Sequence, residues 1–100
     1  MIRIWNIETS SIVYELFGHS DAAQYTQIVW DLIYLKEKNY LVSSSNDKKI
    51  RIWDLDKIEQ PIRTLTGHSQ AVRGLAVLDN GVLASASHDK TIKLWDTQFF

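Results

Sequence analysis

The sequence predicts an all-β fold made of antiparallel strands, and three observations carry this prediction. Apolar and polar residues alternate in short runs such as IRIW (50–53) and IKLW (92–95), so each run has one face to bury. β-branched and aromatic residues, which favour strands, dominate these runs. Polar turn residues separate them, and Asn80-Gly81 is among the strongest short signals for a hairpin.

Two further segments need separate arguments. Residues 28–38 (IVWDLIYLKEK) are apolar enough to suggest a helix, but their counterpart, 72–80 (VRGLAVLDN), contains Gly74 and runs into the Asn-Gly turn. These features favour a strand in both copies. Pro61 precedes IRTL (62–65), where a strand can begin without losing a ladder hydrogen bond.

The chain also repeats itself. Three pairs of segments match: 48–56 (KKIRIWDLD) with 90–98 (KTIKLWDTQ), 16–22 (LFGHSDA) with 65–71 (LTGHSQA), and 40–50 (YLVSSSNDKKI) with 82–92 (VLASASHDKTI). Residues 3–8 (RIWNIE) are a weaker third copy of the first pair. The same order recurs each time: Gly-His, a strand, Ser-x-Ser-x-Asp, and a strand ending in Trp-Asp. Since several independent positions agree, the repeat is a strong signal.

Composition excludes several classes of protein. Eleven basic and twelve acidic residues give a net charge of −1, which provides no general attraction to nucleic acid or anionic membranes. The densest basic run, KKIR (48–51), is interpreted as the solvent face of a strand. The absence of Cys excludes disulfides and thiolate metal sites.

Location is predicted from the same totals. No apolar run approaches the ~18 residues that span a bilayer, and residues 1–11 lack the apolar core of a signal peptide. The lack of Cys suits an intracellular protein. An intracellular, cytoplasmic location is expected, with a nuclear or ciliary location left open.

The repeat, with Gly-His near its start and Trp-Asp at its end, resembles the WD-repeat β-propeller family. The resemblance implies four-stranded antiparallel blades, with strands lettered a to d from the central axis outward. Nine strands are then expected: 2–7 and 12–17 as c and d of one blade, 28–36, 40–45, 49–54 and 62–66 as a to d of the next, and 72–78, 82–87 and 91–96 as a to c of the third. The corresponding segments are 1–17, 18–66 with a long d–a loop, 67–96 without strand d, and a tail at 97–100.

Nine strands do not close a ring, because a propeller has about 4–8 blades of four strands. The chain is expected to be either a piece of a longer propeller or a self-associating partial propeller. Head-to-tail association duplicates strand c and leaves an exposed edge, which favours the first interpretation.

The resemblance also implies a structural network in each complete repeat. The two sets are His19, Ser43, Asp47 and Trp53, and His68, Ser85, Asp89 and Trp95. A buried Trp needs an acceptor for its indole N–H, a strand-b hydroxyl provides it, and the imidazole bridges that hydroxyl to the turn carboxylate. The N-terminal copy departs from the pattern, because Asn6 follows Trp5.

Ser, His and Asp are also the components of a hydrolase triad. Their recurrence in two copies, each tied to a Trp, favours a structural role, so no catalytic residue is expected. Metal binding by His19, His68 and His88 is not expected either, because their spacing is unsuitable and no paired carboxylates lie nearby. No Gly-rich phosphate loop is present, and no cofactor is expected.

Partner binding is expected on the loops, which a rigid scaffold holds in place. Compared with the second repeat, the first carries about six extra residues within 20–27. In the family, the start of strand a and the residue before the turn Asp often face a partner. The candidates are therefore Trp30, Arg73, Asn46 and His88, with Tyr25 from the insertion. For Trp30 the alternative is that it packs beneath its own long loop. For the other two residues the favoured interpretation is structural: Tyr25 packs within the loop, and His88 is a solvated turn residue.

These observations predict a non-enzymatic protein–protein interaction scaffold, a propeller segment within a larger protein or multiprotein assembly. Its partners are other proteins of unknown identity, and neither nucleic acid nor membrane is expected to be bound directly. The alternatives are a purely structural section of a large ciliary, transport or ribonucleoprotein machine and the self-associating partial propeller. The Trp-Asp-x-Arg sequence of some ubiquitin-ligase substrate receptors is absent, because Asp56 and Gln98 occupy the Arg position.

Overall fold

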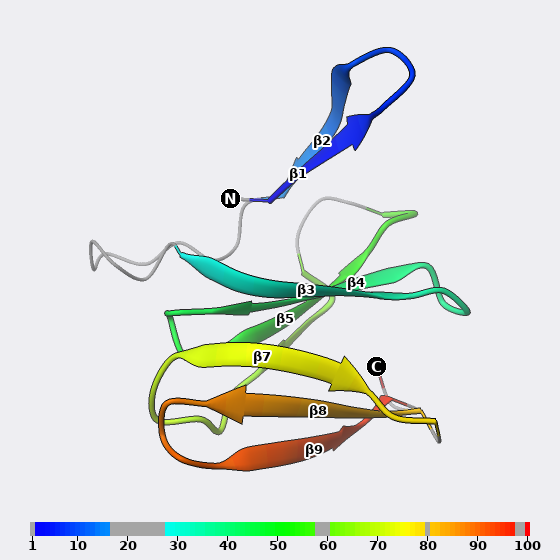
Figure 1. Cartoon of the computed structure of the whole chain (residues 1–100). Coiled ribbons are helices and arrows are strands. Elements are labelled where there is room, and N and C mark those ends of the chain that lie inside the picture. The colour runs from blue at the N-terminus through cyan, green and yellow to red at the C-terminus, as the bar shows by residue number, and fades with distance from the viewer. Residues whose placement is uncertain (1, 17–27, 58–60, 80, 98–99) are drawn as a thin grey trace.

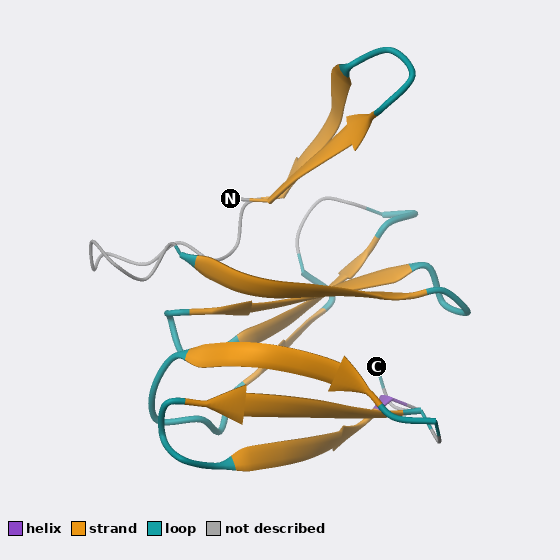
Figure 2. Cartoon of the chain, viewed as in Figure 1, coloured by secondary structure: helices purple, strands orange, loops and turns teal. Residues whose placement is uncertain are grey.

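The computed structural model describes residues 2–16, 28–57, 61–79, 81–97 and 100. Within these ranges nine strands form three antiparallel sheets, and none of the described segments is an α-helix (Figures 1 and 2). The all-β class is therefore confirmed. No helix in the described part of the chain has the length and apolar character needed to cross a membrane.

Each strand pairs with its neighbour in the sequence. The first sheet contains β1 (Ile2–Asn6) and β2 (Ser11–Leu16), the second β3 (Val29–Leu35), β4 (Tyr40–Ser45), β5 (Ile50–Asp54) and β6 (Arg63–Leu65), and the third β7 (Val72–Val77), β8 (Val82–Ser87) and β9 (Ile92–Asp96). The observed strand ends lie within one residue of those expected from the repeat.

The β8–β9 turn shows why Ser-x-Asp recurs. Ser87 Oγ accepts a hydrogen bond from the backbone N–H of Asp89 (3.0 Å), and Asp89 Oδ1 accepts one from the N–H of Thr91 (2.9 Å). Lys90 has a left-handed φ of 71°. The β4–β5 turn has the same arrangement at Ser45, Asp47, Lys48 and Lys49. Short polar side chains thus satisfy the turn backbone locally.

The second sheet lies between the other two (Figure 1). One of its faces packs against the third sheet around a core of Val42, Ile50, Ile52, Val72 and Leu83, all fully buried. The opposite face packs against the first sheet around Ile2, Leu16 and Trp53. Since side chains alternate between the faces of a strand, the period-two pattern of each run supplies both contacts.

The outer face of the third sheet is open within the described structure. Ile92 and Leu94 are 72% and 64% exposed, whereas Ile50 and Ile52, at the equivalent positions of β5, are fully buried. The sequence thus provides the same apolar face twice, and within the described residues this face is covered in the second sheet and open in the third.

Candidate functional site

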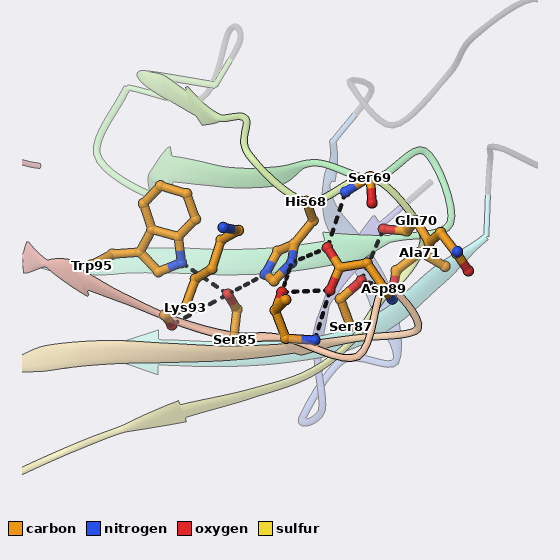
Figure 3. A network of polar contacts seen from close by, with 10 residues as sticks. His68, Ser69, Gln70, Ala71, Ser85, Ser87, Asp89, Lys93 and Trp95 are labelled. Atoms are coloured by element: carbon orange, nitrogen blue, oxygen red, sulfur yellow. Dashed lines mark hydrogen bonds and ion pairs between the residues drawn. The ribbon is translucent and has the colours of Figure 1, made fainter.

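Ser85 is the centre of a buried polar network (Figure 3). Trp95 Nε1 donates to Ser85 Oγ at 2.8 Å, His68 Nε2 lies 2.7 Å from the same oxygen, and His68 Nδ1 lies 2.9 Å from Asp89 Oδ2. A carboxylate only accepts hydrogen bonds, so Nδ1 carries the proton and donates to Asp89. In the neutral imidazole, Nε2 then accepts from the Ser85 hydroxyl. The structure therefore brings together all four residues of the C-terminal set.

The Asp89 carboxylate is held by several donors. The Thr91 hydroxyl is the largest influence and lowers the pKa of Asp89 well below its ordinary value of 3.8. The His68 imidazole and the backbone N–H groups of Ser69 and Thr91 lower this pKa further, while burial opposes them. The carboxylate consequently stays charged to a lower pH than an ordinary Asp, and its contacts fix the β8–β9 turn against the His68 segment.

The N-terminal set is described in part. Trp53 Nε1 donates to Ser43 Oγ at 2.9 Å, and both side chains are buried. His19 lies outside the described residues. Asp47 is buried and pairs with Arg51 at 2.5 Å between Oδ2 and Nη1. The interpretation of KKIR as a solvent face is wrong for Arg51, whose side chain is only 11% exposed, because the turn carboxylate draws it inward.

The predicted partner-binding residues form a second group on the loop edge. Trp30 and Arg73 each occupy a β-bulge at the start of strands β3 and β7, between the paired residues on either side. A bulge adds one unpaired residue and redirects its side chain. Both strands begin at the edge that also carries the β4–β5 and β8–β9 turns, on the left of Figure 1.

Four of these residues are joined in a chain, which we call the Trp30–Arg73 ladder (Asn46, Trp30, Arg73 and His88). Trp30 Nε1 donates to Asn46 Oδ1 at 3.2 Å, and the Arg73 guanidinium carbon lies 3.7 Å from the Trp30 ring centroid. Arg73 Nη1 lies 2.9 Å from His88 Nε2. The ladder crosses from the second sheet to the third, and Trp30 remains 40% exposed. Tyr25 lies outside the described residues.

Two contacts were not expected from the sequence. Asp31 Oδ2 accepts a hydrogen bond from the backbone N–H of Leu75 at 2.9 Å and so links the second and third sheets. The Asp47–Arg51 ion pair is the other. Arg51 aligns with Lys93, so a cation occurs at this position in both repeats. This recurring cation is the sequence feature that indicates the ion pair.

Other candidate sites are weaker. Among the described residues no group of three His, Cys, Asp or Glu side chains is placed to hold a metal ion. A cleft of about 540 Å³ lies on the opposite edge of the sheets, between the β3–β4 and β7–β8 turns. Its lining includes Lys36, Glu37, Lys38 and Asp79, a mixture of charges without a convergent arrangement.

Comparison with known proteins identifies the family. The sequence profile described as "WD domain, G-beta repeat" matches residues 10–54 and 59–96. The chain therefore belongs to the WD-repeat family, whose repeats build blades of the kind formed by the second sheet. The family generally provides non-enzymatic scaffolds for protein–protein interaction.

Curated relatives agree with this assignment. WD repeat and SOCS box-containing protein 1 from Takifugu rubripes is 36% identical over 72 residues, covering 71% of this chain and 16% of the relative. The Homo sapiens protein of the same name is 33% identical over 76 residues, covering 75% and 17%. Nuclear distribution protein PAC1 from Gibberella zeae is 35% identical over 82 residues, covering 80% and 16%. The chain thus spans about a sixth of the length of these relatives.

Proposed function

We propose that this chain is a non-enzymatic protein–protein interaction scaffold, a propeller segment within a larger protein or multiprotein assembly. The observation that carries the proposal is the Trp30–Arg73 ladder, which places Trp, Arg, Asn and His side chains in contact on one loop edge. Trp and Arg are the residue types most enriched at interaction hot spots. An intracellular, cytoplasmic location is part of the same proposal.

The surroundings of Ser85 support the non-enzymatic part of this proposal. A nucleophilic Ser needs an accessible oxygen and a base that takes its proton as the substrate arrives. Ser85 is 1% exposed, and its oxygen already accepts the indole N–H of Trp95. The Ser–His–Asp contacts therefore hold the β8–β9 turn, the His68 segment and Trp95 in one arrangement.

The proposal is tested by affinity capture from a lysate of the source cells. The Trp30→Ala, Arg73→Ala double variant removes the centre of the ladder, and Lys36→Ala removes a cation from the opposite edge of the sheets. We expect the double variant to lose proteins that the unmodified chain and Lys36→Ala both retain. Retention of the same proteins at the same yield by the double variant contradicts recognition by the ladder.

A purely structural role is the second candidate, and the open face of the third sheet favours it. Ile92 and Leu94 are apolar and largely exposed, whereas a strand face in contact with water usually carries polar residues. Such an exposed apolar face is typical of a surface that packs against another element. Under this alternative, Ile92→Thr with Leu94→Thr removes the chain from its assembly, while the double variant of Trp30 and Arg73 remains bound.

A further inference from the structure

Arg73 is a cation without a carboxylate partner among the described residues. Among the described residues its side chain contacts the Trp30 ring, whose centroid lies 3.7 Å from the guanidinium carbon, and His88 Nε2, which lies 2.9 Å from Nη1. Arg51, which follows the β4–β5 turn, is by contrast paired with Asp47, and its side chain is only 11% exposed. Arg73 is thus held through the face of its guanidinium group and through Nη1, while Nε and Nη2 make no hydrogen bond to any described residue.

The orientation of Arg73 is fixed by three features. The bulge directs it away from the β7–β8 ladder. Stacking on Trp30 restrains the guanidinium plane and adds a cation–π attraction. His88 accepts from Nη1 only through an unprotonated Nε2, because Arg has donors alone. A side chain with several rotatable bonds is therefore ordered before any partner arrives, which lowers the entropic cost of binding.

Among the described residues, the acidic side chains near Arg73 already have hydrogen-bond or ion-pair partners. Asp31 accepts hydrogen bonds from the backbone N–H groups of Leu32 and Leu75, and Asp47 pairs with Arg51. Asp89 accepts from Thr91 and Ser69 and contacts His68. Lys48 and Lys90 are exposed in the adjacent turns. Within the described residues, this edge consequently presents cations outward and directs its carboxylates inward.

We propose that Arg73 binds a carboxylate side chain of an acidic segment in the partner protein, with Trp30 and His88 holding the guanidinium in position. This inference rests on the proposed interaction function and specifies the chemistry of the partner. An Arg fork binds a carboxylate through two parallel N–H···O hydrogen bonds, a geometry that the Lys ammonium does not provide.

The test uses two labelled probes, a fluorescein-tagged (Glu-Gly)4 peptide and its uncharged match, (Gln-Gly)4, titrated with the full chain and followed by fluorescence anisotropy. We expect the Glu peptide to bind more tightly. Arg73→Lys keeps the net charge and should weaken Glu-peptide binding by about tenfold. Trp30→Leu should also weaken Glu-peptide binding, and Lys36→Ala should leave that binding unchanged.

Equal binding of the two peptides, or unchanged Glu-peptide affinity in Arg73→Lys, overturns the inference. Arg73 is on the surface, and circular dichroism verifies that each variant keeps its fold. The two proposals fail separately: if the Trp30, Arg73 double variant loses captured proteins but the peptides bind alike, the interaction function stands and the acidic partner does not. If neither experiment responds to Arg73, both proposals are wrong.

Discussion

Nε2 of His68 lies 2.7 Å from the side-chain oxygen of Ser85, and both residues are buried. With Asp89 on the other ring nitrogen, the order of contacts is that of a hydrolase triad. The difference is Trp95, whose indole N–H occupies an acceptor position of the Ser oxygen. The sequence Ser–His–Asp of hydrogen-bonded contacts therefore does not by itself distinguish a catalytic group from a structural one. The burial of Ser85 and its hydrogen bond from Trp95 do make that distinction.

The buried indole of Trp53 gives the first prediction. It is 2% exposed and donates to Ser43, so Trp53→Phe removes both a hydrogen bond and packed volume. We expect the free energy of unfolding to fall by about 1–3 kcal/mol in urea denaturation. Trp5→Phe is the control, because Trp5 is 53% exposed and should change little. Equal effects of the two substitutions contradict the role given to Ser43.

The stability contributed by Asp89 is expected to depend on pH. Its pKa is lowered in the folded chain relative to 3.8 in an unfolded one, so its carboxylate contributes stability above about pH 4 that is lost as the pH falls through the folded-state pKa. Asp89→Asn lacks this contribution. The difference in unfolding free energy between the two proteins should be largest near pH 7 and shrink toward pH 2. A difference that stays constant over this range argues against a lowered pKa of Asp89 in the folded chain.

Ser44 is expected to be dispensable. Its hydroxyl is fully buried between the second and third sheets and has no hydrogen-bond partner in the described structure, and Ala86 occupies the equivalent position of the next repeat. Removing an unsatisfied buried group is neutral or favourable. Ser44→Ala should therefore keep or raise the melting temperature, whereas Ser43→Ala should lower it. A marked loss of stability in Ser44→Ala reveals a partner for this hydroxyl.

Gly81 is expected to tolerate Asn better than Ala. Its φ of 78° lies in the left-handed region, and an added Cβ meets Thr97 Oγ1 at 3.4 Å. Ala at such a φ costs about 1 kcal/mol, whereas Asn adopts it more readily. Asn39, in the equivalent turn of the second sheet, has a φ of 55°. Thermal melts of Gly81→Ala and Gly81→Asn provide the comparison, and identical melts contradict it.

The strands and the Ser85 network were accessible from the sequence for physical reasons. Alternation between two faces is a local property, so runs such as 92–95 indicate both their strand and its buried side. The resemblance to the WD-repeat family then implied that His68, seventeen positions before Ser85, rather than the neighbouring His88, joins the network, as the hydrogen bonds now show.

Contacts between sheets were not accessible in this way. The stacking of Arg73 on Trp30 depends on two bulges and on the distance between the second and third sheets. The Asp31–Leu75 hydrogen bond has the same origin. The alignment of the two repeats placed Trp30 and Arg73 at equivalent positions. Equivalent positions in two repeats need not be in contact, so the alignment did not predict the stacking.

The most direct test of the account is Ser85→Ala, examined for thermal unfolding and for hydrolysis of p-nitrophenyl acetate by the same preparation. This substitution leaves the Trp95 N–H and the His68 imidazole without their shared oxygen. We predict a loss of about 1–3 kcal/mol in stability, with hydrolysis by the unmodified chain no faster than that by the variant. Loss of a measurable hydrolase activity, with stability unchanged, contradicts a structural role for the Ser–His–Asp–Trp network.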